Sequence, residues 1–239
     1  MTTPNNPAAT IKHETPTPSA TSDALYGSDV IAGTLRALDI EYIALNPGAS
    51  YRGLHDSLVN YLGNKKPQMV LCLHDENAAS IAQGYWKASN KLMAVGLHSN
   101  VGLMHASMPI FNAWCDRAPM LILGATGPWD AAKRRPWIDW IHTCSDQAAL
   151  VRNFTKWDNQ PGSTAAAVEA MIRGAQLSMM APRAPVYVNL DVTIQEEKLE
   201  APLPMPDMAR YAPPPMVRPS ETELEAAAKL LSNAKNPVM

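Results

Sequence analysis

The sequence predicts an α/β protein built on a doubly wound parallel sheet with helices on both faces. Short apolar runs alternate along the chain with helix-like segments of roughly ten residues or more, which is typical of βαβ units. Runs such as "LMAVGL" (92–97) are apolar without interruption, as expected for strands that are buried on both faces. Turn residues such as Asn46-Pro47-Gly48 follow these runs directly.

The predicted elements begin with a helix at 29–38 ("DVIAGTLRAL") and a strand at 41–45 ("EYIAL"). A helix at 53–62 comes next. The apolar run "QMVLCL" (68–73) then predicts a strand, which we expect to be central and buried on both faces. The remaining predicted elements are a helix at 77–89, a strand at 92–97, a helix at 102–114, a strand at 119–125, helices at 145–152 and 164–180, and a strand at 184–190.

The composition divides the chain into four parts. Residues 1–25 are rich in Pro, Thr, Ser and Asn and predict a disordered tail. Residues 26–195 carry the alternating pattern and form the predicted domain. Residues 196–219 contain too many prolines for a core element and predict an extended linker. Residues 220–239 predict an amphipathic helix that opens with a capping box.

We interpret the last helix as the first element of a truncated second domain, because a single helix after a long linker has nothing of its own to pack against. The sequence is then expected to be a fragment of a longer protein. The alternative is a C-terminal helix that docks back on the first domain.

The bulk properties exclude several classes of function. The 239 residues carry a formal net charge of −2 with both signs scattered, so we expect no nucleic-acid partner. No apolar run approaches the length of a membrane span, and the N-terminus lacks the features of a signal peptide. The three cysteines are far apart and predict reduced thiols. A cytoplasmic protein without a membrane partner is expected.

The candidate site residues lie at the predicted strand ends, where parallel sheets bind their ligands. Asp75 and Glu76 follow one strand, and the segments 46–50 and 98–102 follow two others. Each has a purely structural alternative, since an acid at a helix start is often a cap and Asn-Pro-Gly is often only a turn. Walker A, GxGxxG and GxSxG motifs are absent, and the histidines show no metal-binding spacing.

Taken together, these segments resemble the N-terminal pyrimidine-binding domain of thiamine diphosphate enzymes, the family of acetolactate synthase and benzoylformate decarboxylase. The similarity covers about residues 26–195. It lies in "NPGAS" (46–50), "HDENAASIAQGYWKAS" (74–89), "LHSNVGLMHASMPIFNAWCDRAPMLILGATGP" (97–128) and "RAPVYVNLD" (183–191), which occur in the family's order and at its separations.

The resemblance implies a catalytic carboxyl. In the family, a glutamate binds a ring nitrogen of the aminopyrimidine, and the ring then takes the proton from the thiazolium carbon that attacks a 2-keto acid. The family places this glutamate nine residues before the glycine that is Gly84 here, which is the position of Asp75. Glu76 is one residue late. Either Asp75 or Glu76 has this role, or the function has been lost.

Further residues are implied at the neighbouring strand ends. His98 matches a catalytic histidine of the benzoylformate decarboxylase branch, whereas Ala49 replaces a serine of that branch, with Ser50 next to it. His105 replaces a family asparagine. An aromatic 2-keto acid therefore does not carry over as the substrate. The residues that the resemblance assigns to cofactor binding are Asn46, Pro47, Gly48, Ala49 and Ser99.

The resemblance also implies partners. The cofactor is expected between subunits of a homodimer or homotetramer, and its Mg²⁺ is expected on a diphosphate-binding domain that this sequence lacks. The fragment alone would then be inactive, while the protein that contains it would decarboxylate or ligate a 2-keto acid. One alternative is a non-catalytic interaction module. Another is the α subunit of a split decarboxylase, although the almost fifty residues after the last predicted strand count against that reading.

Overall fold

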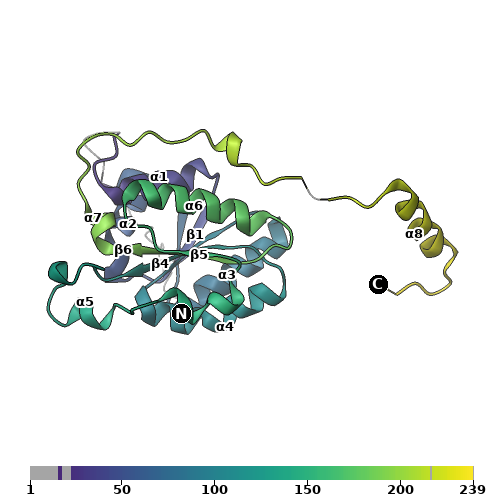
Figure 1. Cartoon of the computed structure of the whole chain (residues 1–239), viewed down its shortest axis with the longest axis horizontal. Coiled ribbons are helices and arrows are strands. Elements are labelled where there is room, and N and C mark those ends of the chain that lie inside the picture. Colours follow the sequence, from purple (N-terminus) through teal and green to yellow (C-terminus); the bar gives the residue numbers. More distant parts are fainter. Residues whose placement is uncertain (1–15, 18–22, 216, 239) are drawn as a thin grey trace, which may run out of the picture.

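The computed structural model describes residues 16–17, 23–215 and 217–238, so most of the tail predicted at 1–25 lies outside the described residues. The described residues form a six-stranded, all-parallel sheet in the order β2-β1-β3-β4-β6-β5 (Figure 1). The strands are β1 (Tyr42–Leu45), β2 (Gln68–Leu71), β3 (Ala94–Leu97), β4 (Leu121–Thr126), β5 (Asp158–Asn159) and β6 (Val186–Asp191). The predicted doubly wound α/β class is confirmed.

Helices cover both faces of the sheet. In Figure 1, α1 (Gly27–Ala37) and α6 (Thr164–Met179) lie above it, and α3 (Asp75–Ser89) and α4 (Ser99–Cys115) lie below. Each pair buries its own apolar cluster against the sheet. The upper cluster includes Ile31, Leu35 and Met171, and the lower one includes Ala78, Trp86, Leu103 and Ile110.

The position of β2 corrects the prediction of a central strand buried on both faces. β2 pairs only with β1 and is an edge strand, with Gln68 and Leu71 exposed. Leu73, just beyond it, is 92% exposed. A continuous apolar run does not show how many neighbours a strand has, which is why the sequence placed it wrongly. Cys72 is buried in the lower apolar cluster.

Two predicted helices are irregular. The helix expected at 53–62 is divided into α2 (Arg52–Asp56) and the π-helical η2 (Ser57–Tyr61), and the 3₁₀ turn η1 (Ala49–Tyr51) precedes it. The helix expected at 145–152 is wrong: two 3₁₀ turns, η4 (Ala148–Leu150) and η5 (Arg152–Phe154), take its place. There, the buried Gln147 donates from Nε2 to the carbonyl oxygen of Ala125 on β4, so that contacts with the sheet fix the segment.

Several short elements had no sequence prediction. They are the two-residue β5, η3 (Ala131–Lys133), α5 (Ile138–Ile141), α7 (Val192–Glu196) and η6 (Met208–Tyr211). A strand of two residues and helices of three to five residues are too short to produce a periodic pattern.

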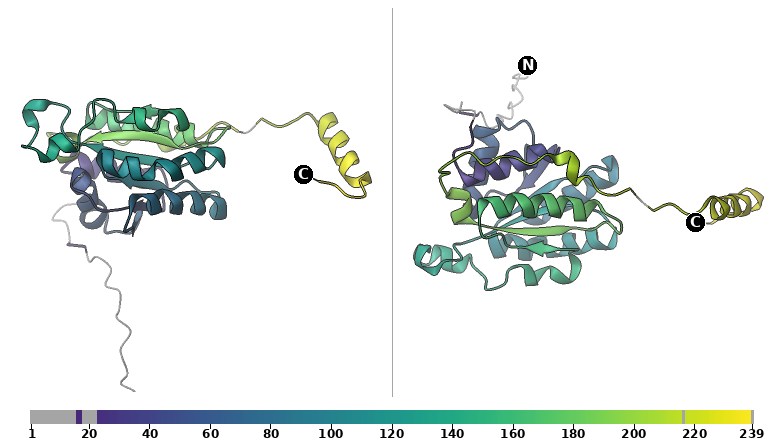
Figure 2. Two further views of the ribbon diagram at one scale, coloured as in Figure 1. Left: turned by 90° about the horizontal axis from the view of Figure 1, so that it is seen from below. Right: turned by 45° about the horizontal axis from the view of Figure 1, so that its top comes forward.

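The Pro-rich segment after α7 is extended, but it also packs on the domain. Leu199, Leu203 and Met208 contact a cluster of Val30 from α1 with Val168 and Ile172 from α6. Figure 2 shows this segment passing along α1 and α6.

The last helix forms with the predicted capping box. α8 (Glu221–Asn233) is capped by Ser220, whose backbone nitrogen donates to Glu223 Oε2 at 3.0 Å while its hydroxyl accepts from the Glu223 backbone nitrogen at 3.3 Å. All described residues of α8 are exposed, and the helix stands away from the sheet in Figure 1. Its assignment to a second domain stays a prediction.

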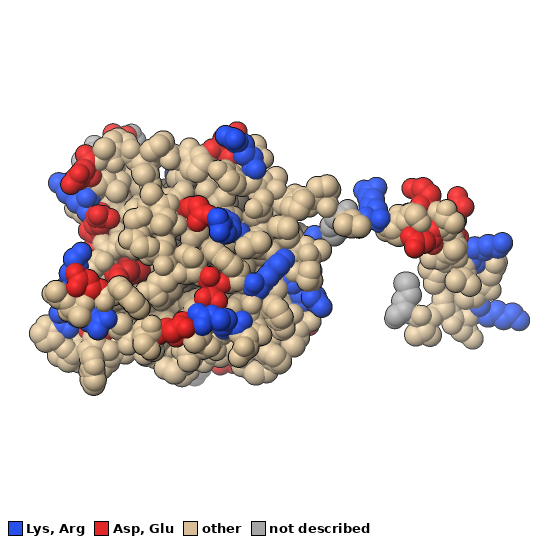
Figure 3. Space-filling model, viewed as in Figure 1, with Lys and Arg blue, Asp and Glu red and all other residues tan. Residues whose placement is uncertain are grey.

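Charges of both signs are interspersed on the face drawn in Figure 3. That face carries no continuous basic surface of the kind that binds nucleic acid. Among the described residues, none of the helices combines the length and the apolar character needed to cross a bilayer.

Candidate functional site

The candidate site lies at the carboxyl ends of the strands on both sides of the point where the strand order reverses. From β1 the chain runs outward to β2 and then returns to place β3 on the other side of β1. Asn46 follows β1, His98 follows β3, and Asp75 begins the helix after β2. Doubly wound sheets bind ligands at such a switch point because the loops diverge there.

Asp75 is the buried acid of the neighbouring pair, with 5% of its surface exposed. Its Oδ1 accepts a hydrogen bond from the backbone nitrogen of His98 at 3.1 Å, and its Oδ2 accepts one from Asn46 Nδ2 at 3.1 Å. A carboxylate has about four acceptor positions, so these two contacts leave capacity for a further partner. The carboxyl therefore joins the ends of three strands.

Glu76 points elsewhere. Its side chain is 57% exposed, and its Oε2 lies 3.9 Å from His74 Nδ1. His74 is the N-cap of α3, because its Nδ1 accepts from the Glu76 backbone nitrogen. Adjacent residues of a helix point about 100° apart, so the two acids cannot enter the same space. Of the two candidates that the sequence left open, only Asp75 reaches Asn46 and His98.

His98 stands at the start of α4, where its half-buried ring meets a hydroxyl and a second imidazole. Its Nδ1 lies 2.8 Å from Ser50 Oγ, and its ring centroid lies 4.7 Å from that of His142. Burial lowers the pKa of His98, and the nearby His142 lowers it further, while Asp75 acts in the opposite direction. A neutral imidazole is therefore favoured at this position.

Two glycines make room for these side chains. A Cβ on Gly102, in α4, would lie 2.3 Å from Asp75 Oδ1. A Cβ on Gly48 would lie 2.4 Å from Cγ and Nδ1 of His98. Both distances are far below van der Waals contact, so the positions of Asp75 and His98 depend on the absence of side chains at Gly48 and Gly102.

The other predicted residues are placed less centrally. Ser99 is fully buried in left-handed conformation (φ 44°), and its Oγ donates to Asn100 Oδ1 at 2.8 Å. Pro47 and Ala49 are exposed, and together with Gly48 they line a hollow of about 610 Å³ next to α2. It is Ser50, rather than Ala49, that contacts His98.

Three residues of this region were not among the predicted site residues: Ser50, His142 and Gln195. Gln195 is fully buried in α7 and donates from Nε2 to the Ser50 carbonyl oxygen at 2.9 Å, although 145 positions separate the two residues. His142 follows α5 in the irregular Trp-rich stretch. Ser50 could have been suspected from its place beside Asn46-Pro47-Gly48, but no sequence pattern links His142 or Gln195 to the site.

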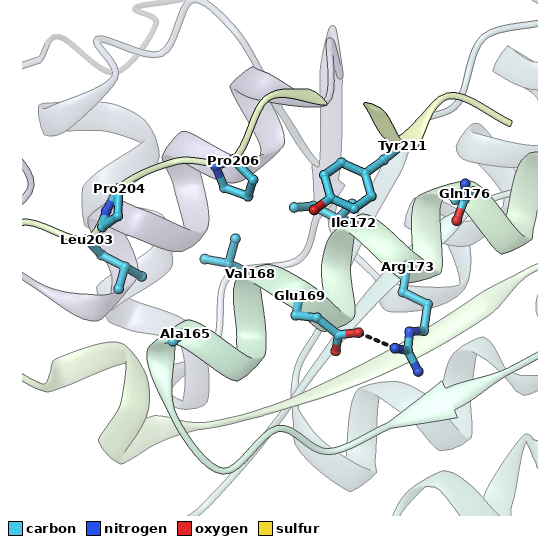
Figure 4. Close-up of a pocket in the computed structure, with 10 residues that line it drawn as sticks. All are labelled: Ala165, Val168, Glu169, Ile172, Arg173, Gln176, Leu203, Pro204, Pro206 and Tyr211. Atoms are coloured by element: carbon cyan, nitrogen blue, oxygen red, sulfur yellow. Dashed lines mark ion pairs between the residues drawn. The ribbon is translucent and has the colours of Figure 1, made fainter. Parts of the chain in front are cut away.

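A different hollow, of about 330 Å³, lies between α6 and the Pro-rich segment (Figure 4). We call it the α6 groove; Val168, Ile172, Leu203, Pro206 and Tyr211 are among its lining residues. Its charged lining residues, Glu169 and Arg173, form an ion pair with each other at 2.5 Å. Within the described residues, no group of three or more His, Cys, Asp or Glu side chains is arranged to hold a metal ion.

More than half of the chain matches a known protein family. Residues 25–151 match the family described as "Thiamine pyrophosphate enzyme, N-terminal TPP binding domain". This range includes Asn46, Asp75, His98 and His142, and it makes up more than half of the chain.

Among curated proteins, the acetolactate synthase large subunit of Lactococcus lactis is 27% identical over 215 residues, which are 89% of this chain and 36% of that protein. Benzoylformate decarboxylase of Pseudomonas aeruginosa is 24% identical over 170 residues, 71% of this chain and 31% of that protein. The chain thus spans about a third of the length of these relatives.

Solved structures share the fold. The thiamine diphosphate-dependent 4-hydroxybenzoylformate decarboxylase of Rhodococcus jostii matches with a TM-score of 0.66 at 20% identity, covering 89% of this chain and 38% of that one. Benzoylformate decarboxylase from Polynucleobacter necessarius matches with a TM-score of 0.69 at 19% identity, covering 90% and 38%.

Proposed function

The chain belongs to the thiamine pyrophosphate enzyme family, and from this premise we propose that it is the pyrimidine-binding part of a thiamine diphosphate-dependent enzyme that decarboxylates or ligates a 2-keto acid. The observation that carries the proposal is the buried Asp75 carboxyl, held at the switch point of the sheet by Asn46 and the His98 backbone.

The residues present fit the cofactor in kind. Binding an aminopyrimidine through a ring nitrogen requires a carboxyl that is shielded from water and has a free acceptor or a proton to share. Asp75 is shielded, and only two of its acceptor positions have partners within the described part of the chain. Asp75 has a shorter side chain than the family's glutamate, and the lack of a side chain at Gly102 leaves the room that its carboxyl occupies.

Bound thiamine diphosphate supplies an electron sink for breaking or forming the bond next to a keto group. In the proposed site, Asp75 would share a proton with the pyrimidine ring, and Asn46 orients the Asp75 carboxyl through its amide. His98, which is favoured in its neutral form, accepts or returns a proton beside the substrate, while Ser50 fixes the ring by its contact with Nδ1. Asn46, Pro47, Gly48, Ala49 and Ser99 are the proposed cofactor-binding residues.

The proposal includes a homo-oligomeric partner. One side of α4 exposes an apolar stripe beside the site, formed by Val101, Met104, Met108 and Phe111, each 40–58% exposed. Such a stripe is typical of a surface that another domain covers. We propose that a diphosphate-binding domain with its Mg²⁺ lies there, contributed by another subunit.

We also propose a cytoplasmic location, which the three unpaired cysteines support.

The same stripe favours a second candidate, a non-catalytic interaction module. In that case the domain would serve assembly, and Asp75 would only join Asn46 to the start of α4 through its two hydrogen bonds. The two candidates predict different behaviour toward thiamine diphosphate.

Calorimetry with thiamine diphosphate and Mg²⁺ tests the proposal on two proteins, this 239-residue chain and the product of its full reading frame. We expect weak or undetectable binding by the chain alone, and binding with 2-keto acid turnover by the full product. A full product that binds the cofactor no better than the chain, or that binds it without turning over any 2-keto acid, would contradict the enzymatic proposal and favour the interaction module.

A further inference from the structure

A second histidine accompanies His98 at the site. His142 follows α5, and its ring centroid lies 4.7 Å from that of His98 at an interplanar angle of 51°. Both rings are half-buried. At such a separation, two imidazolium charges would repel each other strongly, because partial burial reduces solvent screening. The geometry therefore disfavours a state in which both rings are charged.

The orientation of His142 is fixed by a hydrogen bond within its own segment. Its Nδ1 lies 2.7 Å from the carbonyl oxygen of Ile138. A carbonyl oxygen only accepts, so Nδ1 must carry the hydrogen, and in a neutral ring the lone pair is then on Nε2. His142 consequently keeps one defined tautomer with its basic nitrogen at Nε2.

The segment that carries His142 is tied to both sides of the site. Asn100 Nδ2, in the first turn of α4, donates to the Ile141 carbonyl oxygen at 3.2 Å, and the Gly127 backbone nitrogen donates to the His142 carbonyl oxygen at 3.1 Å. Asp139, 4% exposed, holds Arg135 through both carboxylate oxygens at 2.7 and 3.0 Å. Arg135 lowers the pKa of that carboxyl, so the pair stays ionised.

We propose that His142 is a positioning residue of the site, which keeps His98 neutral and so able to accept a proton. Its importance for turnover rests on the proposed function, whereas the coupling between the two rings does not. The reaction would then lose rate in acid only where His98 itself is protonated, because a charge on His142 opposes that protonation.

The groups that face His98 act in different directions. From α3, Asp75 favours the charged imidazole, and His142 opposes it. The Ser50 hydroxyl is neutral, and burial raises the pKa of the Tyr51 phenol, whose ring meets that of His98 edge to face at 6.3 Å. Among these facing groups, His142 is the one that opposes Asp75, so its removal leaves only burial to lower the pKa of His98.

The chain provides a matched control. His74 and His105 form another imidazole pair with the same centroid separation of 4.7 Å, His74 at the N-cap of α3 and His105 within α4. His105 is exposed, and its ring packs against His74 rather than against His98. Removing His105 thus deletes an imidazole of equal kind from a neighbouring place without changing the surroundings of His98.

The experiment is an imidazole NMR titration of the 239-residue chain and its His142→Asn and His105→Asn variants. We expect the His98 midpoint of the wild type to lie below the ordinary 6.5 and to rise in His142→Asn, with no change in His105→Asn. The ¹⁵N shifts of neutral His142 in the wild type should show the hydrogen on Nδ1. His142→Gln repeats the measurement if the Asn variant loses its fold.

An unchanged His98 midpoint in a folded His142 variant would overturn the proposal, as would a wild-type His142 that carries its hydrogen on Nε2. In the full reading-frame product, His142→Asn should shift the acid limb of the pH–rate profile to higher pH. If this variant turns over substrate with the acid limb of the wild type, only the proposed role of His142 is wrong. If the full product does not bind the cofactor, the proposed function is wrong, but the coupling that NMR measures between the two rings still stands.

Discussion

Different interactions hold the site at the carboxyl edge and the α6 groove together. In the groove, Leu203 and neighbouring residues cover Val168 and Ile172, and the charged pair Glu169–Arg173 is internally neutralised. At the carboxyl edge, hydrogen bonds connect Asn46, Asp75 and His98. Apolar burial dominates the first region, and polar contacts between strand ends dominate the second.

The difference shows that a well-formed cavity and a chemical site need not coincide. The groove has the apolar lining expected of a ligand pocket, yet its two charged side chains neutralise each other. The carboxyl edge instead holds a shielded carboxyl and an imidazole whose pKa is lowered, which is the pattern that marks functional positions. Substitutions in the groove should therefore change stability, and those at the edge should change chemistry.

The largest effect on stability is expected in the groove. Ile172 is 4% exposed and lies in the cluster that holds the Pro-rich segment. Ile172→Ala removes buried methyl groups and should cost about 2–5 kcal/mol in the free energy of unfolding, measured by urea titration. Glu169→Gln, which breaks only an exposed ion pair, is the matched control at about 0.3–0.5 kcal/mol. A changed pKa of His98 in folded Ile172→Ala would contradict the contrast, because a substitution in the groove would then affect the chemistry of the site.

A smaller loss is expected from Gly102→Ala, because the new Cβ would meet Asp75 Oδ1 at 2.3 Å. Displacement of the carboxyl should cost about 1–3 kcal/mol in the free energy of unfolding, again measured by urea titration. A Cβ on Gly84, in α3, would meet no atom within 4 Å, so Gly84→Ala should instead stabilise by about 0.5–1 kcal/mol. Equal changes in the free energy of unfolding for the two variants would show that the Asp75 carboxyl can move away from residue 102 without cost.

The smallest effect concerns the pH dependence of stability. Because the pKa of His98 in the fold lies below its ordinary 6.5, the unfolded chain binds more protons between the two values. Neutral His98 thus contributes stability that is present above pH 6.5 and is lost as the pH falls. Melting temperatures of wild type and His98→Asn between pH 5 and 8 test this: the wild-type value minus the variant value should rise with pH. A difference that grows toward acid would reverse the sign and contradict the burial of a neutral ring.

The sequence predicted most of the sheet but not its short or edge elements. Long apolar runs located β1, β3, β4 and β6, whereas the two-residue β5 has no periodic signal. β2 was located but wrongly placed at the centre of the sheet, because strand order depends on pairings that an apolar run does not encode. The helix predicted at 145–152 failed because the side chain of Gln147 binds β4.

In the site, Asn46, Asp75 and His98 were predicted from the positions of the strand ends and from the family resemblance. The structure places these three residues in contact. Counting alone left Asp75 and Glu76 unresolved, because only the helix start at Asp75 decides which carboxyl is buried. His142 lies 44 positions from His98 in an irregular segment, so that only the folded loop brings their rings together.

Hydrogen–deuterium exchange at C2 of thiamine diphosphate, bound to the full reading-frame product and followed by NMR, tests the central claim most directly. Asp75→Asn should slow this exchange by roughly 10²–10⁴, because it removes the buried carboxyl that we propose shares a proton with the cofactor. Glu76→Gln should leave the exchange near the wild-type rate, because the Glu76 side chain is 57% exposed. Exchange at the wild-type rate in Asp75→Asn would contradict the account. If exchange were then slow in Glu76→Gln, Glu76 would be the relay. If both variants exchanged C2 at the wild-type rate, the non-catalytic interaction module would be favoured.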